Sequence, residues 1–547
     1  MNYINEYKRW LLNADEETKN ELSQITDKKE IEDRFYRQLE FGTGGIRGII
    51  GAGTNRINKY IVARATKGLA EFIKKNSKNL SSESVVIAYD CRNFSKEFAH
   101  TASNVLCSNG IKTYIFDDLR PTPELSFAVR HLSATAGIVI TASHNPAKYN
   151  GYKVYWSDGG QVPPDIASGI FEEILKIDFF DVTFDLNTSL QTVIGKSIDD
   201  AYIESVYAQS VNPYVHKLNF KLVYTPLHGS GNKPVRRILE RAGFKNVFVV
   251  KEQEEPDGNF PTVASPNPEN KECFEYAIKL AKENDVDLII GTDPDSDRVG
   301  VVVRNATGEY EPLTGNQVGI LLLNYILSSM NCTSKDAVVS TIVSTRMAKV
   351  VADYYGVTYF ATLTGFKYIG EKIHEFEMEK SHDFVFGFEE SYGYLKGTYC
   401  RDKDAVIASM LISEMAAYYQ EKGKTLCDAL AELYEKHGAF SEELVSITLE
   451  GADGLLRISN IMKNLRKNPP EKIGDFKITN IVDYLGTTNL PKSDVLYFEL
   501  ENDIHFAIRP SGTEPKIKLY YLSKADTLEN ADRKIEMVKK IISNIIS

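Results

Sequence analysis

The segment Asp287-Leu-Ile-Ile-Gly-Thr-Asp-Pro-Asp-Ser-Asp-Arg298 decides the fold class of this 547-residue chain. An apolar run of strand length ends abruptly in acidic residues at every second position. Short apolar runs bounded by turn residues are typical of buried strands in parallel sheets, and such sheets bind their ligands beyond the carboxyl ends of the strands. We therefore expect an α/β domain with a polar site at the end of this strand.

The same succession of elements occurs three times along the chain. Each copy opens with a β-branched run, continues through a helical stretch and a second short strand, and reaches a third apolar run that ends in polar residues. Strands that alternate with helical stretches predict βαβ units and a largely parallel sheet in each copy. The opening runs are 84–90, 221–225 and 337–343, the second runs are 112–116, 246–250 and 357–360, and the third runs are 137–143, 287–293 and 383–389.

The chain from about residue 440 onward has a different pattern. Residues 495–508 predict two strands joined at Glu501-Asn-Asp503, and a third strand at 516–521 precedes a lysine-rich helix. Adjacent strands with a short turn are typical of an antiparallel sheet. The predicted fold class is therefore α/β, with three similar mixed α/β domains and a C-terminal α+β domain. The expected domains are 1–207, which includes an N-terminal extension, then 208–313, 314–437 and 438–547.

Composition excludes several classes of protein. The chain is 43% hydrophobic and 25% charged, and 64 Lys and Arg against 75 Asp and Glu give a net charge of −11. These values exclude a disordered or collagen-like chain, and they predict no nucleic-acid or membrane partner. No apolar run approaches the roughly 18 residues of a spanning helix, no signal-peptide core is present, and the six cysteines form no Cys-x-x-Cys pair. We expect a reduced, cytoplasmic protein that is a monomer or a dimer.

The acidic segment predicts a metal site. If it stays extended, Asp293, Asp295 and Asp297 lie on one side of the chain. Three adjacent carboxylates repel each other unless a hard cation neutralises them, and oxygen ligands favour Mg²⁺, Mn²⁺ or Ca²⁺ over zinc. An EF-hand is excluded because its glycine and glutamate positions hold Arg298 and Arg304. A solvated acidic turn is the remaining alternative.

Two other polar breaks also offer chemistry. In Thr141-Ala-Ser-His-Asn-Pro146, Ser143 is a candidate nucleophile or phosphate carrier that a nearby base would activate. In Gly387-Phe-Glu-Glu-Ser-Tyr-Gly393, Glu389 and Ser391 offer acceptors for vicinal sugar hydroxyls. Taken singly, each of these segments is also compatible with an ordinary turn.

A fourth segment, Arg509-Pro-Ser-Gly-Thr-Glu-Pro-Lys516, combines a guanidinium, hydroxyls, a lysine and a glycine-opened backbone, which together suit a phosphate dianion. An incidental charged turn is the alternative. No Walker loop occurs, so nucleotide binding is not supported. Together the four segments predict an enzyme that handles a phosphorylated sugar by phosphoryl transfer through the serine. Further cations near these segments are Arg47, Lys153, Arg298, Lys367 and Lys403.

The four segments, in this order, resemble the signature loops of the α-D-phosphohexomutases, a family that includes phosphoglucomutases, phosphomannomutases and a phosphopentomutase-like branch. The resemblance covers nearly the whole chain. It implies four domains in a heart shape around a central, locally cationic cleft, with the fourth domain as a lid. It also implies a phosphoserine enzyme with one Mg²⁺ per chain and a sugar bisphosphate as activator.

The resemblance also implies roles for individual residues. Ser143 would be the phosphoserine and would complete the Mg²⁺ site. Reacting groups would be contacted by His144, Lys153 and Lys403, and Arg47 and Arg298 would be catalytic arginines near the phosphoserine. The general acid and the general base stay unassigned. The metal ligands would be Ser143, Asp293, Asp295 and Asp297, and the substrate-binding residues would be Thr364, Gly365, Lys367, Glu389, Ser391, Arg509, Ser511, Gly512, Thr513 and Lys516.

The expected reaction is the interconversion of glucose 1-phosphate and glucose 6-phosphate through a sugar bisphosphate. The Glu389-Glu-Ser391 sequence resembles the form of glucose-preferring members. By contrast, Phe41-Gly-Thr-Gly-Gly-Ile-Arg-Gly48, the N-terminal extension and Thr364-Gly-Phe-Lys367 resemble the branch with pentose-phosphate and mannose-phosphate enzymes. Phosphomannomutase and phosphopentomutase activities therefore stay open, as does a metal-dependent sugar phosphatase that uses the same serine and aspartates.

Overall fold

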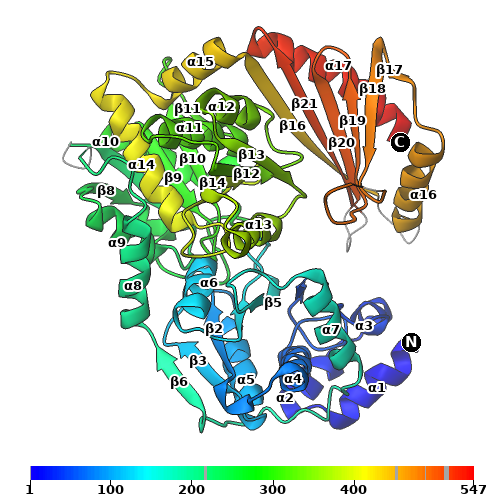
Figure 1. Cartoon of the computed structure of the whole chain (residues 1–547). Helices are drawn as coiled ribbons and strands as arrows, with labels where there is room; N and C mark the ends of the chain where they lie inside the picture. Colours follow the sequence, from blue (N-terminus) through cyan, green and yellow to red (C-terminus); the bar gives the residue numbers. More distant parts are fainter. Residues whose placement is uncertain are drawn as a thin grey trace. The chain divides into compact units, whose positions relative to one another are not determined.

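The structure is a computed structural model that describes residues 2–42, 44–214, 219–449, 454–486, 488–510 and 516–546 (Figure 1). Contacts divide the chain into two compact units, and each unit is built from several stretches of sequence. Unit 1 comprises Met1–Thr314, Ile369–Phe384 and Tyr392–Tyr418, and unit 2 comprises Gly315–Tyr368, Val385–Ser391 and Tyr419–Ser547.

Unit 1 begins with three short helices and a six-stranded sheet of order β1-β5-β4-β2-β3-β6. The helices are α1 (Tyr3–Asn13), α2 (Glu16–Ser23), α3 (Lys28–Phe35), α4 (Lys59–Asn76), α5 (Ser95–Ser108), α6 (Thr122–His131), α7 (Pro164–Leu175) and α8 (Lys196–Tyr207). The strands are β1 (Gly45–Ile49), β2 (Ser84–Tyr89), β3 (Lys112–Phe116), β4 (Ala136–Ile140), β5 (Tyr149–Trp156) and β6 (Gln191–Ile194). Every side chain of β2 and β4 is buried, which explains their unbroken apolar runs.

A second sheet in unit 1 has the order β11-β10-β9-β7-β8. Its strands are β7 (Lys221–Thr225), β8 (Asn246–Val249), β9 (Leu288–Thr292), β10 (Val299–Arg304) and β11 (Tyr310–Leu313), with α9 (Asn232–Arg241) and α10 (Glu275–Asn284) in the connections. Unit 1 also contains β15 (Gly393–Lys396) and most of α13 (Phe366–Glu379) and α14 (Ala405–Glu421).

Both sheets of unit 1 are mixed, so the expectation of largely parallel sheets is wrong for the two strands at one edge of each sheet, whereas β6 and β8 at the opposite edges are parallel to their neighbours. The strand β5 runs antiparallel to β4 and β1, and β10 runs antiparallel to β9 and β11. The inner pairs, such as β2 with β4 and β7 with β9, are parallel. The cause is connection length: the chain returns directly after each polar break, whereas a parallel crossover needs about a dozen residues or more.

Unit 2 contains strands of two sheets. In the first, β12 (Asp336–Thr341) pairs in parallel with β13 (Thr358–Thr362), beside α11 (Gly315–Ser328) and α12 (Met347–Tyr355). The strand β14 (Asp383–Glu389) belongs to the same sheet, and Ser391, two residues beyond its end, is the last residue before the chain returns to unit 1.

The second sheet of unit 2 is antiparallel throughout and has the order β16-β21-β20-β19-β18-β17. This confirms the antiparallel sheet expected near the C-terminus, with the turn at residues 501–503. The strands are β16 (Ala439–Thr448), β17 (Lys472–Ile473), β18 (Phe476–Asp483), β19 (Leu496–Leu500), β20 (Ile504–Pro510) and β21 (Lys516–Ala525), and the helices are α15 (Leu426–His437), α16 (Gly454–Lys467) and α17 (Leu528–Ile546).

The two faces of this antiparallel sheet pack against different partners. One face buries Phe498 and Phe506 against apolar residues of α16 and α17, including Met462 and Val538. The opposite face carries Tyr497, Tyr520 and Leu522, which cluster with Val343 and Leu363 at the ends of β12 and β13. Because strand residues alternate between the two faces, the two clusters use different residues of the same strands. In the described parts of the chain, no helix combines the length and apolarity needed to cross a membrane.

Candidate active site

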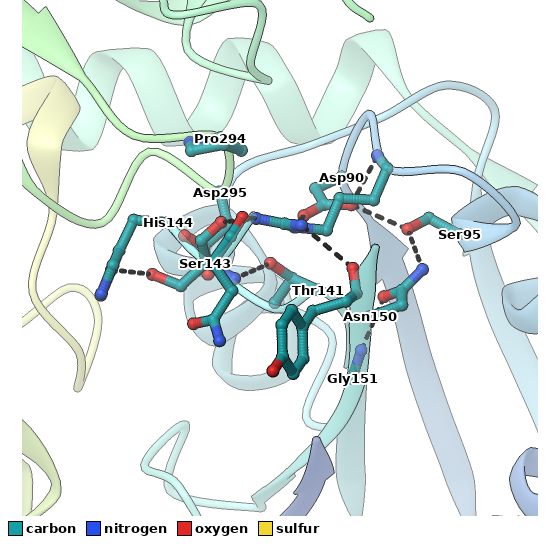
Figure 2. Close-up of polar contacts among 12 residues, drawn as sticks. Asp90, Ser95, Thr141, Ser143, His144, Asn150, Gly151, Pro294 and Asp295 are labelled. Atoms are coloured by element: carbon teal, nitrogen blue, oxygen red, sulfur yellow. Dashed lines mark hydrogen bonds and ion pairs between the residues drawn. The ribbon is translucent and has the colours of Figure 1, made fainter. Parts of the chain in front are cut away.

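Ser143 lies just beyond the carboxyl end of β4 in an unusual backbone conformation (Figure 2). Its φ angle is +51°, which is costly for a residue other than glycine. The Ser143 N–H donates to Thr141 Oγ1 over 2.8 Å, and only 4% of the residue is exposed. A strained, buried turn of this kind is typical of functional sites, because the surrounding contacts must hold it in place.

The Ser143 hydroxyl is held between a carboxylate and an imidazole. Its Oγ donates to Asp293 Oδ2 over 2.8 Å and lies 3.2 Å from His144 Nδ1. Burial lowers the pKa of His144 well below its usual value, and the positive charges of Arg298 and Arg47 lower it further. The imidazole is therefore neutral near pH 7 and can accept a proton.

The three predicted aspartates converge. One carboxylate oxygen from each of Asp293, Asp295 and Asp297 lies within 4.8 Å of the others, and all three side chains are buried. The expectation that an extended chain aligns them is wrong. Ser296 has φ +52° and donates its N–H to the Asp293 carbonyl over 2.9 Å, so a turn brings the carboxylates together.

The triad has the properties of a site for a hard cation. Burial and the negative charges of Asp295 and Asp297 raise the pKa of Asp293 well above its usual value. The Oδ1 atoms of Asp295 and Asp297 are buried and have no hydrogen-bond partner among the described residues. Unpaired, crowded carboxylate oxygens without nitrogen or sulfur donors fit Mg²⁺, Mn²⁺ or Ca²⁺.

Two of the predicted lysines contact the triad. Lys153 Nζ lies 3.0 Å from Asp295 Oδ2, and Lys403 Nζ lies 2.7 Å from Asp297 Oδ2. Burial raises the pKa of Asp295, but the charges of Lys153 and Lys403 outweigh it, so the net pKa lies below the usual value. Lys153 comes from β5, where it stands opposite Gly45 and Val139, and Lys403 comes from the loop before α14.

The two predicted arginines also lie near Ser143. Arg47 on β1 donates from Nη1 to Asn145 Oδ1 over 2.9 Å. Arg298 donates from Nη1 to Glu269 Oε1 over 2.8 Å, and its Nε lies 3.9 Å from Asp297. The structure thus brings together all the residues of unit 1 that the sequence singles out for chemistry.

Sequence reasoning missed Arg92, which organises the serine loop. Its guanidinium is fully buried, lies 3.4 Å from Asp90 and stacks 5.0 Å from the Phe260 ring centroid. The available signal was Asp90-Cys-Arg92, a polar break after β2 that resembles the other strand ends. The guanidinium donates to the main-chain carbonyls of Ser143, Asn145, Pro146 and Tyr149.

Two further supports of the triad were also missed. Thr122, the first residue of α6, donates its hydroxyl to Asp295 Oδ2 over 3.0 Å and its N–H to the Asp295 carbonyl over 2.9 Å. Tyr155 donates its hydroxyl to Asp402, the neighbour of Lys403. These contacts join positions far apart in the sequence, and no local pattern marks them.

The predicted sugar-binding residues lie in unit 2. Glu389 is 4% exposed, and its Oε1 accepts a hydrogen bond from the Gly365 N–H over 2.9 Å. Gly365 has φ +122°, a conformation that favours glycine. The Thr364 Oγ1 is buried and has no hydrogen-bond partner among the described residues. Lys367 lies on the same segment, with its Nζ 4.8 Å from the Tyr368 ring centroid.

The predicted phosphate-binding residues Arg509 and Lys516 lie at the adjoining ends of β20 and β21. Ser511, Gly512 and Thr513 fall outside the described residues. The Tyr520 hydroxyl is hydrogen-bonded to Arg509, and burial together with the nearby charges of Glu390 and Glu389 raises its pKa. Unit 2 therefore brings Arg509 and the Glu389 loop near one tyrosine hydroxyl.

Comparisons with known proteins agree with this geometry. Three family descriptions match in order: "Phosphoglucomutase/phosphomannomutase, alpha/beta/alpha domain I" over residues 38–181, domain II over 200–308 and domain III over 314–437. Phosphoglucomutase from Staphylococcus aureus strain USA300 is 41% identical over 519 residues and covers 92% of each chain.

Solved structures of low sequence identity share the fold. A putative phosphomannomutase from Thermus thermophilus has a TM-score of 0.71 at 21% identity, over 93% of this chain and 99% of that one. N-acetylphosphoglucosamine mutase from Aspergillus fumigatus, solved with GlcNAc-6P and magnesium, has a TM-score of 0.52 at 13% identity, over 94% and 97%. The four-domain α/β fold is confirmed, and the chain belongs to the α-D-phosphohexomutase family of phosphosugar mutases.

Proposed function

We propose that the chain interconverts glucose 1-phosphate and glucose 6-phosphate through phosphorylated Ser143 and a glucose 1,6-bisphosphate intermediate. The observation that carries this proposal is the hydrogen bond from Ser143 Oγ to Asp293, inside a buried carboxylate triad with Lys153 beside it. The choice of glucose is supported by the Staphylococcus aureus phosphoglucomutase and by the sequence Glu389-Glu-Ser391.

Phosphoryl transfer to the sugar forms one bond and breaks another. The free hydroxyl oxygen of the sugar phosphate bonds to the phosphorus on Ser143, its proton passes to a base, and the P–Oγ bond breaks with the electron pair left on Oγ. Oγ takes up a proton, and the bisphosphate turns over. Ser143 Oγ then bonds to the phosphorus at the other end, and the P–O bond to the sugar breaks with its electron pair left on the sugar oxygen, which is protonated to the hydroxyl of the product. In that second step the neutral imidazole of His144, 3.2 Å from Oγ, accepts the serine proton.

Cationic side chains stabilise the transferring group. Lys153 and Lys403 reach the triad directly, and Arg47 and Arg298 lie close enough to depress the pKa of His144. We assign all four to charge stabilisation on the phosphoryl oxygens, where fixed cations in a buried site act most strongly.

The family is metal-dependent, and the triad fits one Mg²⁺ per chain. Asp293, Asp295 and Asp297 would hold the ion together with an oxygen of phosphorylated Ser143. Bound there, Mg²⁺ would withdraw negative charge from the phosphoryl oxygens. Magnesium in the Aspergillus fumigatus complex supports this choice among the hard cations.

The residues of unit 2 are assigned to the sugar. Glu389 and Ser391 would bind the ring hydroxyls, and the unpaired Thr364 hydroxyl, next to Gly365, offers a further donor or acceptor. Lys367 would lie at the same end of the substrate. The phosphate that does not react would be held by Arg509, Ser511, Gly512, Thr513 and Lys516.

The test is a comparison of kcat/KM on the 1-phosphates of glucose, mannose, ribose and N-acetylglucosamine, with Mg²⁺ and the matching sugar bisphosphate as activator. We expect glucose to be preferred by about tenfold or more, since a site built for particular hydroxyls penalises others. A higher value for mannose or ribose would reassign the substrate. Ser143→Ala should form no phosphoprotein and no isomer, and release of inorganic phosphate in place of isomer would contradict the phosphoserine route.

A further inference from the structure

A cavity of about 300 Å³ lies in unit 2 away from the residues assigned to the reaction. Its walls come from β12, α12 and β13 on one side and from the antiparallel sheet on the other. None of the residues assigned above to the sugar, the phosphate or the metal lines it. Its lining includes Arg346, Tyr359, Phe440, Tyr497, His505 and Lys524.

The contact between Arg346 and His505 fixes the protonation of the histidine. The Arg346 Nη1 contacts His505 Nε2. A guanidinium can only donate hydrogen bonds, so Nε2 accepts and the proton of the neutral ring lies on Nδ1. Burial and the charge of Arg346 lower the pKa of His505 to about 4, in agreement with a neutral ring at pH 7.

The resulting Nδ1–H of His505 is a buried donor without an acceptor. His505 is 5% exposed, and Nδ1 has no hydrogen-bond partner among the described residues. A buried donor left unpaired is costly, so an acceptor supplied by a ligand would be favoured there.

Among the described residues, two cations at the cavity form no ion pair, although the carboxylates of Asp353, Glu442 and Asp503 also line it. Neither Arg346 nor Lys524 has a described carboxylate within 4.0 Å, whereas the neighbouring Lys349 pairs with Asp353 over 2.7 Å. Lys524 instead lies over the Phe440 ring, 5.2 Å from its centroid. Unpaired cations beside a buried donor favour an anionic group.

Aromatic rings form part of the remaining wall. Tyr359 and Tyr497 line the cavity, and the Tyr497 ring lies 5.8 Å from the His505 ring between centroids. The Tyr359 hydroxyl is hydrogen-bonded to Ser340, so a ligand would contact the ring of Tyr359. Aromatic faces favour planar rings, and the volume is at the small end of the range for ligand pockets.

We propose that this cavity binds a small anion that carries a planar ring, with the anionic group on Arg346 and the ring against Tyr359 and Tyr497. A nucleoside monophosphate and an aromatic carboxylate both have this chemistry. The site is separate from the proposed mutase chemistry. Because both sheets of unit 2 contribute to its walls, a bound ligand also stabilises their packing.

The test is calorimetric titration of the full chain with Mg²⁺ and saturating glucose 1,6-bisphosphate, so that the substrate phosphate sites are occupied. The probes are adenosine 5′-monophosphate, 4-hydroxybenzoate, adenosine and inorganic phosphate. We expect adenosine 5′-monophosphate, 4-hydroxybenzoate or both to bind with one equivalent per chain. Adenosine and inorganic phosphate should bind at least about tenfold more weakly. The anion that binds more tightly shows whether the site prefers a phosphate or a carboxylate.

Three variants locate the site. Arg346→Ala should weaken binding by about tenfold or more, since it removes a charge-assisted bond. Ala361→Phe places a ring at an exposed position of β13 that lines the cavity, and it should block binding while Arg346 and His505 stay in place. Arg533→Ala, an exposed arginine on α17 paired with Glu529, is the control and should bind normally.

The proposal is overturned if neither anion binds the wild-type chain, or if adenosine binds as tightly as its monophosphate. It is also overturned if both Arg346→Ala and Ala361→Phe retain wild-type affinity. The isomerase rate of these variants is a separate measurement, so failure here leaves the mutase proposal intact.

Discussion

Arg92 donates a hydrogen bond from Nη2 to the main-chain carbonyl of Ser143. The same guanidinium donates hydrogen bonds to three further carbonyls of the loop. These bonds fix the loop in the conformation that gives Ser143 its positive φ. The position of the nucleophile therefore depends on a residue that does not itself face the triad.

Replacement of Arg92 by lysine should lower kcat by about a hundredfold with little change in KM, because a small displacement of a reacting atom costs about that much. Lysine keeps the charge but cannot bond four carbonyls at once. The measurement is steady-state kinetics with a thermal melt. Arg64→Lys is the control, since Arg64 is a buried arginine that bonds the Ile177 carbonyl far along the chain from Ser143. An unchanged kcat in Arg92→Lys would show that the serine loop keeps its conformation without the Arg92 hydrogen bonds.

Loss of Asp295, which we propose as a metal ligand, should abolish turnover. We expect Asp295→Asn to lower kcat by about a thousandfold or more, because electrostatic stabilisation of the transferring group is the largest contribution in this chemistry. Chelation by EDTA should inactivate the wild type, and Mg²⁺ should restore it. Asp287→Asn is the control, because Asp287 pairs with Arg304 next to the same strand but outside the triad. Full activity after chelation would contradict the metal assignment.

The unpaired hydroxyl of Thr364 allows substrate binding to be separated from stability. Thr364→Val should raise KM for glucose 1-phosphate by about threefold to tenfold without lowering the thermal midpoint, because the hydroxyl has no hydrogen-bond partner among the described residues. Thr362→Val is the matched control, since its hydroxyl bonds the Ser340 carbonyl and its loss should lower the midpoint. A lower midpoint for Thr364→Val would mean that this hydroxyl is structural.

A pH effect on stability should come from Asp404. Burial raises the pKa of Asp404 to about 6, although Tyr202 and Tyr399 donate hydrogen bonds to it. The folded-state pKa lies above the unfolded value near 3.9, so the folded chain binds the proton more tightly. The stability from this group is present below pH 4 and is lost as the pH rises through 6, by about 3 kcal/mol.

The measurement is the thermal midpoint of the wild type and Asp404→Asn between pH 4.5 and 7.5. Asparagine does not titrate and keeps an acceptor for the N–H groups of Val406 and Ile407. We expect the thermal midpoint of Asp404→Asn to rise relative to that of the wild type as the pH increases. A constant difference across this range would mean that Asp404 does not titrate there.

The sequence was sufficient for the features that local patterns encode. The apolar run before Asp293 predicted β9, and the acidic residues after it predicted the triad, because burial of a strand and repulsion between carboxylates are local constraints. The backbone conformation that brings the three aspartates together was predicted wrongly. An alternating pattern indicates an extended chain, whereas the left-handed Ser296 makes a turn.

Features that depend on distant parts of the chain could not be predicted. The antiparallel return of β5 follows from a short connection whose direction the apolar pattern does not record. Thr122 is hydrogen-bonded to Asp295, and Arg346 to His505, although each pair is more than a hundred positions apart in the sequence. Hydrogen bonds of this kind have no period in the sequence, so only the folded chain shows them.

The division of the chain has a consequence for how the enzyme is made. The backbone passes between the two units after Thr314, Tyr368, Phe384, Ser391 and Tyr418. The last stretch of unit 1 contains Lys403, whose Nζ contacts Asp297. A ribosome that has synthesised Ser143 and the aspartates must still add more than a hundred residues before this cation is available. No single cut can therefore divide the enzyme into two intact halves, and a truncation at Thr314 would leave the carboxylate triad without one of its two lysines.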